Sequence, residues 1–315
     1  MTLPWKSGRA ISIGECMVEL ARGDDQRFGL GYGGDTFNTA VYLARAGVAV
    51  AYATAVGDDP YSAGIVATAE REMVGTDLIA TVPGRLPGLY LIETTADGER
   101  TFWYWRDRAP ARELFELADA DRIADELRQA SLVYFSGITL SLYSERGLDR
   151  FAAALQAARQ AGALIAMDSN YRPHGWGQDA ERARSVFERF WRLADIAMPT
   201  LEDEQRLWGD ADEQTTASRL RRLGAREVVV KLGARGAFVA GEGFGQLVPA
   251  EKGLQVVDTT AAGDSFNAGY LAARSTGASP VDAARQGNRL ASVVIQHRGA
   301  IVPEDATAAV LGGKP

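Results

Sequence analysis

The segment best suited to chemistry on a phosphorylated ligand is residues 258–271, which read DTTAAGDSFNAGYL. The small side chains of Ala261, Ala262 and Gly263 would let a phosphate approach the backbone N–H groups. If a helix begins here, those N–H groups lack partners and lie at the positive end of the helix dipole. Asp264 would lie in the first turn, as a partner of the dipole or as a general base. A tight turn without a ligand is the alternative.

A second candidate segment, residues 33–38, reads GGDTFN. Gly33 and Gly34 would allow a ligand to approach the backbone, and Asp35 is the expected N-cap of the helix that follows. Asn38 offers both a donor and an acceptor to a hydroxylated ligand. An ordinary turn before a helix is the alternative interpretation.

Other nucleotide-binding motifs are missing from the sequence. There is no GxxxxGKS or GxxxxGKT motif, and no GxGxxG motif follows a predicted strand. A P-loop nucleotide hydrolase and a Rossmann dehydrogenase are therefore disfavoured.

Composition narrows the class of protein further. The 315 residues carry a net charge of −7, which disfavours non-specific binding to nucleic acid. One cysteine, Cys16, and two histidines, His174 and His297, disfavour a disulfide framework and a zinc site. No apolar run approaches the roughly 20 residues of a membrane span, and the apolar run before Glu15 is too short for a signal peptide. We expect a cytoplasmic protein without membrane or nucleic-acid partners.

Short apolar runs alternate with helical patterns along the chain. The predicted strands cover residues 10–14, 48–56, 132–136, 164–168, 195–198, 227–231, 237–240 and 255–257. The predicted helices cover residues 35–46, 62–73, 121–129, 145–160, 180–192, 202–208, 216–223, 262–275 and 280–295. This alternation predicts an α/β fold with a mostly parallel sheet covered on both faces. No linker divides the sequence, so residues 1–315 are expected to form a single domain.

Residues 88–106 depart from this alternation. Two β-rich runs flank Asp97 and Gly98, which form a strong hairpin signal. Together with a strand-like run at 16–20, this hairpin predicts a small β lid whose strands lie near 16–34 and 86–107. An ordinary hairpin at the sheet edge is the alternative. Exposed edges of such a lid would favour a homo-oligomer that pairs lids.

The two candidate segments resemble the two signatures of the ribokinase-like (PfkB) carbohydrate kinases, in matching order and spacing. The resemblance implies a three-layer α/β/α sandwich with a β-strand lid. Several shorter strings are similar to the 2-keto-3-deoxygluconate kinase branch of that family. These strings are GECM at 14–17, LPGLY at 86–90, GERTFWYWR at 98–106, NYRP at 170–173, VVKLGARG at 229–236 and HRGAIVP at 297–303.

The resemblance implies that ATP phosphorylates the terminal hydroxyl of 2-keto-3-deoxygluconate. Asp264 falls on the catalytic base of the family, and the N–H groups of Ala261, Ala262 and Gly263 would stabilise the migrating phosphoryl group. Two arginines suit the carboxylate of a sugar acid. The residues implied for the substrate are Gly33, Gly34, Asn38, Tyr90, Tyr104, Arg106 and Arg172.

The nucleotide contacts implied by the resemblance are Asn170, Lys231, Gly233, Gly236 and Asn288. Magnesium is implied as well. In the family an Asn-x-x-Glu motif is tied to magnesium, whereas residues 200–203 here read TLED, so Asp203 would contact the metal directly or through water. A K⁺ site near Asp258, Thr260 and residues 294–300 occurs in some relatives and stays open here.

These observations leave four hypotheses for the function. A kinase for 2-keto-3-deoxygluconate is the leading one, because a neutral sugar gains little from two desolvated arginines. A kinase for fructose or ribose, a kinase for the C4 epimer 2-keto-3-deoxygalactonate, and a regulator that binds a sugar acid without catalysis are the alternatives. The retained Asp264 disfavours the regulator.

Overall fold

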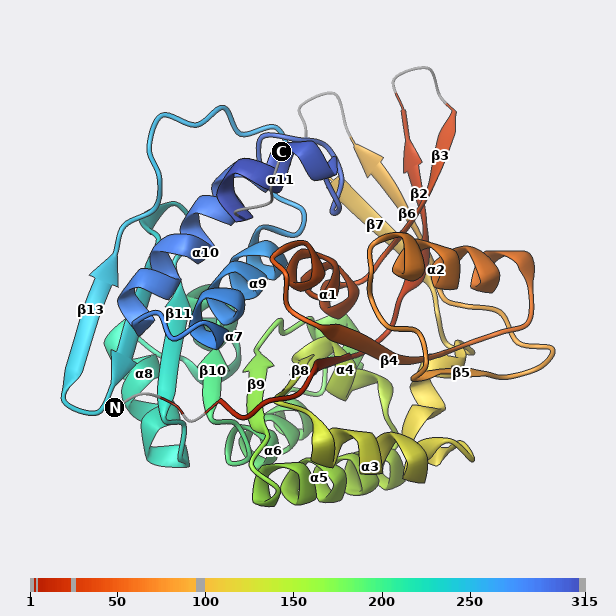
Figure 1. Cartoon of the computed structure of the whole chain (residues 1–315), viewed down its shortest axis with the longest axis horizontal. Coiled ribbons are helices and arrows are strands. Elements are labelled where there is room, and N and C mark those ends of the chain that lie inside the picture. The colour runs from red at the N-terminus through yellow and green to blue at the C-terminus, as the bar shows by residue number, and fades with distance from the viewer. Residues whose placement is uncertain (1–2, 4, 24–26, 95–99, 312–315) are drawn as a thin grey trace.

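The structure is a computed structural model that describes residues 3, 5–23, 27–94 and 100–311. Within these residues nine strands form one sheet in the order β13-β12-β11-β10-β9-β8-β1-β4-β5 (Figure 1). All neighbours from β5 to β11 are parallel, and β12 and β13 add antiparallel strands at one edge. The strands are β1 (Ala10–Ile13), β4 (Val50–Val56), β5 (Ile79–Thr81), β8 (Leu132–Ser136), β9 (Leu164–Asp168), β10 (Ile196–Met198), β11 (Glu227–Lys231), β12 (Ala237–Gly241) and β13 (Phe244–Val248).

Helices cover both faces of this sheet, because buried strand residues alternate between two apolar clusters. Val133 and Phe135 of β8 face one cluster, while Leu132 and Tyr134 face the other. The first face packs against α3 (Ala120–Gln129), α4 (Gly137–Leu142), α5 (Glu145–Gln160), α6 (Ala180–Trp191), α7 (Leu201–Trp208) and α8 (Glu213–Leu223). The second packs against α1 (Asp35–Arg45), α2 (Pro60–Arg71), α9 (Ala262–Ser275), α10 (Pro280–Val294) and α11 (Glu304–Leu311). The predicted three-layer α/β architecture is confirmed.

A second sheet of four strands, in the order β3-β2-β6-β7, projects from one end of the molecule (Figure 1). We call it the small sheet. It consists of β2 (Met17–Arg22), β3 (Phe28–Gly33), β6 (Leu89–Thr94) and β7 (Arg100–Trp105). Its own apolar cluster holds Met17, Tyr90 and Ile92, so most of its stability must come from its attachment to the larger core. The predicted turn at Asp97 and Gly98 lies outside the described residues.

Two local predictions differ from the structure. Residues 255–257 form no strand, because the N–H groups of Val257 and Asp258 donate to the carbonyl of Ile295 after α10, at 2.8 and 3.1 Å, instead of to a neighbouring strand. Asp35 is not the N-cap of α1 but its first residue, and Gly34 occupies the cap position.

The predicted lid range 16–34 contains β3, although glycines interrupt its apolar alternation. The sequence patterns did not reveal β5, β13, α4 or α11. A glycine interrupts the apolar alternation in β13, and β5 and α4 are too short to show a period. The helices of the described residues include none that combines the length and the apolar character needed to span a membrane.

Candidate active site

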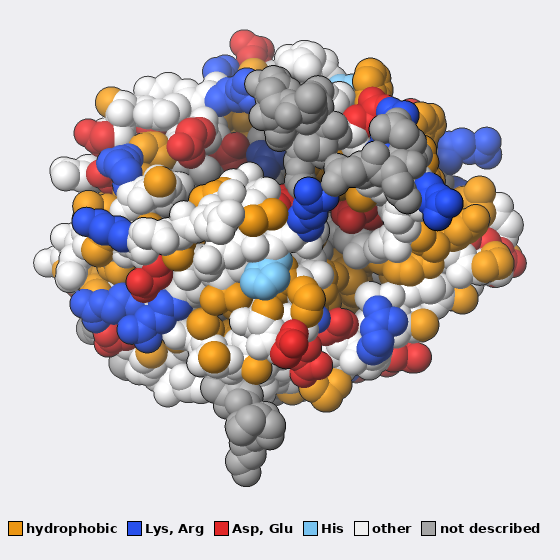
Figure 2. Space-filling model, turned by 90° about the horizontal axis from the view of Figure 1, so that it is seen from above, with side chains coloured by type: hydrophobic (Ala, Val, Ile, Leu, Met, Phe, Trp, Pro, Cys, Tyr) orange, Lys and Arg blue, Asp and Glu red, His pale blue; other side chains and the backbone are white. Residues whose placement is uncertain are grey.

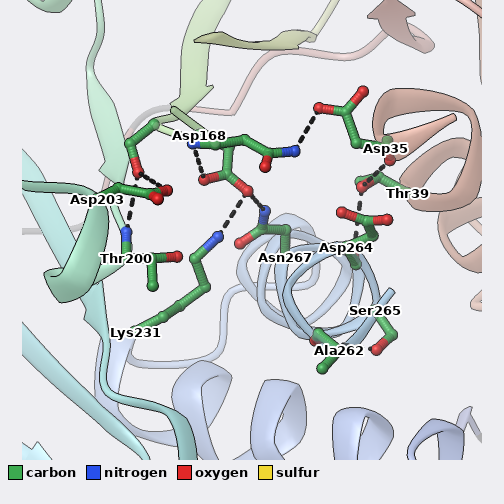
Figure 3. A network of polar contacts seen from close by, with 12 residues as sticks. Asp35, Thr39, Asp168, Thr200, Asp203, Lys231, Ala262, Asp264, Ser265 and Asn267 are labelled. Carbon is green, nitrogen blue, oxygen red and sulfur yellow. Dashed lines mark hydrogen bonds and ion pairs between the residues drawn. The ribbon is translucent and has the colours of Figure 1, made fainter. Parts of the chain in front are cut away.

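The two segments singled out in the sequence meet at the carboxyl ends of the parallel strands, where α/β proteins bind ligands. Asp168 ends β9 and Lys231 ends β11. Asp264 lies in the first turn of α9, and Asp35 begins α1. Figure 3 shows these side chains converging on one network of polar contacts.

Asp264 is buried at the centre of this network. Asn38 donates from Nδ2 to Oδ2 of Asp264 at 2.9 Å, and the hydroxyl of Thr39 donates to its backbone carbonyl at 3.3 Å. Burial, with a further contribution from the negative charge of Asp35, raises the pKa of Asp264 to about 8. The hydrogen bond from Asn38 opposes this shift. A carboxyl group tuned in this direction is a better proton acceptor than an ordinary aspartate.

The start of α9 has the backbone shape of an anion-binding site. Ala261 caps the helix in a left-handed conformation with φ of 59°. Right-handed residues follow, and such a combination turns successive N–H groups toward one point. The N–H groups of Gly263 and Asp264 lie in the first turn, where a helix supplies no partner. The N–H group of Ala262 donates to the carbonyl of Thr259 at 3.2 Å in this structure, and the predicted roles of Ala261 and Ala262 at the phosphoryl group stay predictions.

Asp168 organises the floor of the site. One of its oxygens accepts from Lys231 Nζ and from Asn267 Nδ2, both at 2.6 Å, and the other accepts from the N–H of Asn170 at 3.1 Å. Lys231 is therefore held beside α9, where an ideal Cβ on Gly263 would lie 3.4 Å from Nζ. Sequence reasoning missed Asp168 and Asn267, although an acid at the carboxyl end of a parallel strand is a signal that could have been used.

Asp35 is a further carboxylate that sequence reasoning did not assign to the site. Its Oδ2 accepts from Asn170 Nδ2 at 2.7 Å, and burial raises the pKa of its carboxyl group. The amide of Asn170 thus contacts an acid of the protein in this structure. Its predicted contact with a nucleotide phosphate stays a prediction.

A cavity of about 780 Å³ lies between this network and the small sheet. We call it the small-sheet cavity. Arg106 forms an ion pair in its wall with the buried Glu15, and its guanidinium lies 5.9 Å from the ring centre of Tyr104. Tyr90 donates its hydroxyl to Glu19. The predicted substrate residues Gly34, Asn38, Tyr90, Tyr104, Arg106 and Arg172 all line this cavity.

Gly33, the remaining predicted substrate residue, lies at the end of β3 beside the same cavity wall. A Cβ atom there would lie 2.8 Å from the hydroxyl of Tyr90. At Gly34 a Cβ atom would lie 2.0 Å from the backbone oxygen of Glu15. Packing within the protein therefore already requires glycine at both positions, whether or not a ligand binds there.

Arg172, which also lines the small-sheet cavity, forms an ion pair with Asp203 at 3.3 Å. Asp203 also accepts from Ser169 Oγ at 3.2 Å and from the N–H of Tyr171 at 3.1 Å. Burial raises the pKa of its carboxyl group. In the part of the chain that the structure describes, no three His, Cys, Asp or Glu side chains cluster as metal ligands. A metal at Asp203 would thus take most of its ligands from phosphate and water.

A second cavity of about 500 Å³ lies between α9, α10 and the loop that joins β11 to β12. We call it the helix cavity. Its walls are mainly apolar or backbone, and the predicted nucleotide residues Lys231, Gly233, Gly236 and Asn288 line it. Asn288 donates to the carbonyls of Val248 and Pro249 at 3.3 and 3.0 Å, so its amide fixes the wall of the cavity.

The two cavities share five lining residues, and these residues mark their junction. They are Thr200, Lys231, Thr259, Ala262 and Gly263. Ligands in the two cavities would therefore meet at the N-terminus of α9, next to Asp264. This geometry suits the transfer of a group between two bound molecules.

Asp258 forms hydrogen bonds in the region predicted for a monovalent cation. Its carboxylate accepts from the N–H of Thr260 at 2.8 Å and from the N–H of Gly299 at 2.7 Å. These bonds join the loop before α9 to the turn after α10. A K⁺ ion at this place stays a prediction.

Comparison with known proteins agrees with this geometry. Residues 8–307 match the model of the pfkB family carbohydrate kinases. The chain is 46% identical over 302 residues to the 2-dehydro-3-deoxygluconokinase of Dickeya dadantii (strain 3937), covering 93% of this chain and 96% of that one.

Two solved structures share the fold. The 2-dehydro-3-deoxygluconokinase of Thermotoga maritima has a TM-score of 0.85 at 23% identity, over 98% of this chain and 100% of that one. A putative ribokinase II of Escherichia coli, solved with ATP and magnesium, has a TM-score of 0.83 at 20% identity, over 97% and 99%. The family expected from the two signature segments is confirmed, and the chain belongs to the pfkB family of carbohydrate kinases.

Proposed function

We propose that the protein transfers the γ-phosphoryl group of ATP to the terminal hydroxyl of 2-keto-3-deoxygluconate, also called 2-dehydro-3-deoxygluconate. One observation carries this proposal: a charged cavity and an apolar cavity meet at the N-terminus of α9, beside the buried Asp264. The relative that is 46% identical bears the name of this activity.

The small-sheet cavity would hold the sugar acid. Arg106 and Arg172 both line it, and a guanidinium binds a carboxylate through paired hydrogen bonds. Asn38, Tyr90 and Tyr104 supply polar groups for ketone and hydroxyl oxygens. A neutral sugar such as fructose or ribose brings no carboxylate for the two arginines to bind. A preference for the C4 epimer would depend on individual hydroxyl contacts.

Asp264 would orient the terminal hydroxyl for in-line attack and take up its proton. An alcohol is a weak acid, so proton transfer to a carboxylate is expected late, after the bond to phosphorus has largely formed. The first-turn N–H groups of Gly263 and Asp264 would stabilise charge on the phosphoryl oxygens. Lys231, held beside α9 by Asp168, would add a positive charge at the same junction.

The helix cavity would hold the nucleotide. Its apolar wall suits an adenine ring, and the glycines at 233 and 236 let a ligand approach the loop backbone. A structure with the same fold is described as a complex with ATP and magnesium. Magnesium would supply neutralisation of the triphosphate charge, and Asp203, the acid that the family resemblance implies for the metal, would contact it directly or through water. The need for ATP favours a cytoplasmic location.

The small sheet would act as a lid on a single-domain kinase, closing over the sugar and excluding water. It exposes large apolar side chains, and hydrophobic side chains are visible on the right-hand side of Figure 2, the side on which the small sheet lies. Leu30, Trp103 and Trp105 are 55%, 52% and 60% exposed. We expect a second copy of the chain to cover this face. Light scattering that shows a monomer at micromolar concentration would contradict that expectation.

The experiment that tests the function measures ADP release with magnesium and ATP across a panel of sugars. The panel holds 2-keto-3-deoxygluconate, 2-keto-3-deoxygalactonate, gluconate, fructose and ribose, with the Asp264→Asn variant as blank. Strong preference for the keto-deoxy acids supports the proposal. Preference for fructose or ribose would keep the fold and discard the substrate. ATP binding without turnover of any sugar would favour a regulator.

A further inference from the structure

Glu15 is a buried acid in the wall of the small-sheet cavity that the reaction described above does not use. It lies between β1 and β2, and its side chain is 2% exposed. Its carboxylate forms an ion pair with Arg106, which follows β7 and is 18% exposed. Burial raises the pKa of the Glu15 carboxyl group, and the charges of Arg106 and Arg112 oppose this shift. A buried carboxylate is costly to keep unless it has a defined partner.

The backbone around Glu15 leaves room for this ion pair. A Cβ atom on Gly88 would lie 2.6 Å from Glu15 Oε1 and 3.2 Å from Arg106 Cβ. On the other side of Glu15, a Cβ atom on Gly34 would lie 2.0 Å from its backbone oxygen. Two glycines from separate segments therefore approach the same residue. Any other residue at either position would displace the pair.

We propose that Glu15 is a positioning residue that fixes the guanidinium of Arg106 for the carboxylate of the sugar acid. A guanidinium has five N–H donors in a rigid plane, so it can bind Glu15 and still present N–H groups to an anion in the cavity. The proposal deepens the proposed function and rests on it. Without Glu15, the Arg106 side chain would have more conformers available and would lose entropy when the substrate binds.

Electrostatic repulsion alone predicts the opposite effect of Glu15 on the binding of the sugar acid. A negative charge beside the cavity repels an anionic substrate, so its removal alone would strengthen binding of the sugar acid. Positioning predicts that its removal weakens binding, although the cavity becomes more positive. The direction of the change in KM therefore separates the two explanations.

The test compares Glu15→Gln, Glu15→Asp and Arg106→Ala with the double variant Glu15→Gln/Arg106→Ala in the full-length protein. KM for 2-keto-3-deoxygluconate, KM for ATP and kcat are measured for each, and thermal unfolding checks that each is folded. The matched control is Glu72→Gln, which breaks another Glu–Arg pair, with Arg45 Nε at 2.8 Å, away from both cavities.

We expect Glu15→Gln to raise KM for the sugar acid about tenfold, with kcat and KM for ATP within about twofold of wild type. Glu15→Asp should recover part of the loss. In the Arg106→Ala background, Glu15→Gln should change KM little further, because both residues act on one contact. The control should lower thermal stability and leave KM unchanged.

An unchanged or lowered KM in folded Glu15→Gln would overturn the proposal, as would full additivity with Arg106→Ala. If Glu15→Gln does not fold, a KM unchanged in Glu15→Asp overturns it equally. Failure of the proposed function is distinguishable, because wild-type protein would then not turn over the sugar acid at all.

Discussion

The small-sheet cavity and the helix cavity meet at one point but are built from different kinds of side chain. Acids and arginines line the first, including Glu15, Asp35, Arg106 and Arg172. Apolar side chains and glycine backbone dominate the second. Under the proposed function, charge would select the ligand of the small-sheet cavity, whereas shape and backbone contacts would select the ligand of the helix cavity. A substitution in one cavity should affect one substrate.

The largest expected effect falls at the junction, which serves both ligands. Asp264→Asn keeps the shape of the side chain and its contact with Asn38, but removes the proton acceptor. We expect kcat to fall by about 10²–10⁴, with dissociation constants for ATP and the sugar acid nearly unchanged. Single-turnover kinetics and calorimetry measure the two quantities. Retention of a tenth of the wild-type kcat would show that Asp264 is not the base.

A bulkier side chain in the helix cavity should affect ATP alone. Ala291 lines that cavity from α10, and leucine is compatible with a helix. Ala291→Leu is expected to raise KM for ATP about tenfold by steric exclusion, with KM for the sugar acid unchanged. Initial rates with each substrate varied in turn provide the check. Equal increases in both KM values would mean that the cavities are not independent.

Removal of the more exposed arginine should have a smaller effect on the other cavity. The Arg172 side chain is 58% exposed, so solvent screens its charge. Arg172→Ala is expected to raise KM for the sugar acid about threefold to tenfold and to leave KM for ATP unchanged. KM for fructose, tested as a neutral comparator, should not change. An equal increase for fructose would indicate a structural role for Arg172.

The smallest expected effect concerns the pH dependence set by neighbouring acids. The charge of Asp35 contributes to the raised pKa of Asp264, near 8. The rate should fall as pH drops through this pKa, because the base becomes protonated. Asp35→Asn removes that charge, so the acidic limb of kcat/KM should move to lower pH by less than about one unit. A shift to higher pH would contradict the assignment.

The same raised pKa predicts how stability depends on pH. The folded-state pKa of Asp264 lies above the ordinary value near 4, so the folded protein binds this proton more tightly than the unfolded chain. Its contribution to stability is present below pH 4 and is lost as pH rises toward 8. Denaturant unfolding of wild type and Asp264→Asn should show a difference that grows across this window. A difference in the free energy of unfolding that stays constant between pH 4 and pH 8 would contradict the raised pKa of Asp264.

Local patterns predicted most elements and the start of α9. The bounds of α5 and α9 agree with the predicted ones, because apolar period and helix caps are local features. The anion-binding turn was also predictable, since small residues before a helix act through their own backbone. The predicted strand at 255–257 is wrong, because the N–H group of Val257 donates to Ile295, just after α10, and no local pattern shows this partner.

The acids of the site were harder to predict because their roles depend on the fold. Asp168, Asp35 and Glu15 lie in three separate segments, and each takes its role from a partner distant in sequence. Arg106 was expected to contact the substrate together with Arg172, and the structure also pairs Arg106 with a buried carboxylate that the sequence did not point to. Only the topology places these residues on one cavity.

The most direct test of charge selection is the ratio of kcat/KM for 2-keto-3-deoxygluconate to that for fructose, in wild type and in Arg106→Ala. Loss of a desolvated guanidinium that binds a carboxylate costs about 2 kcal/mol or more, or roughly 30-fold. We predict that the ratio falls at least that much, while KM for ATP stays unchanged. An unchanged ratio would contradict selection by charge in the small-sheet cavity.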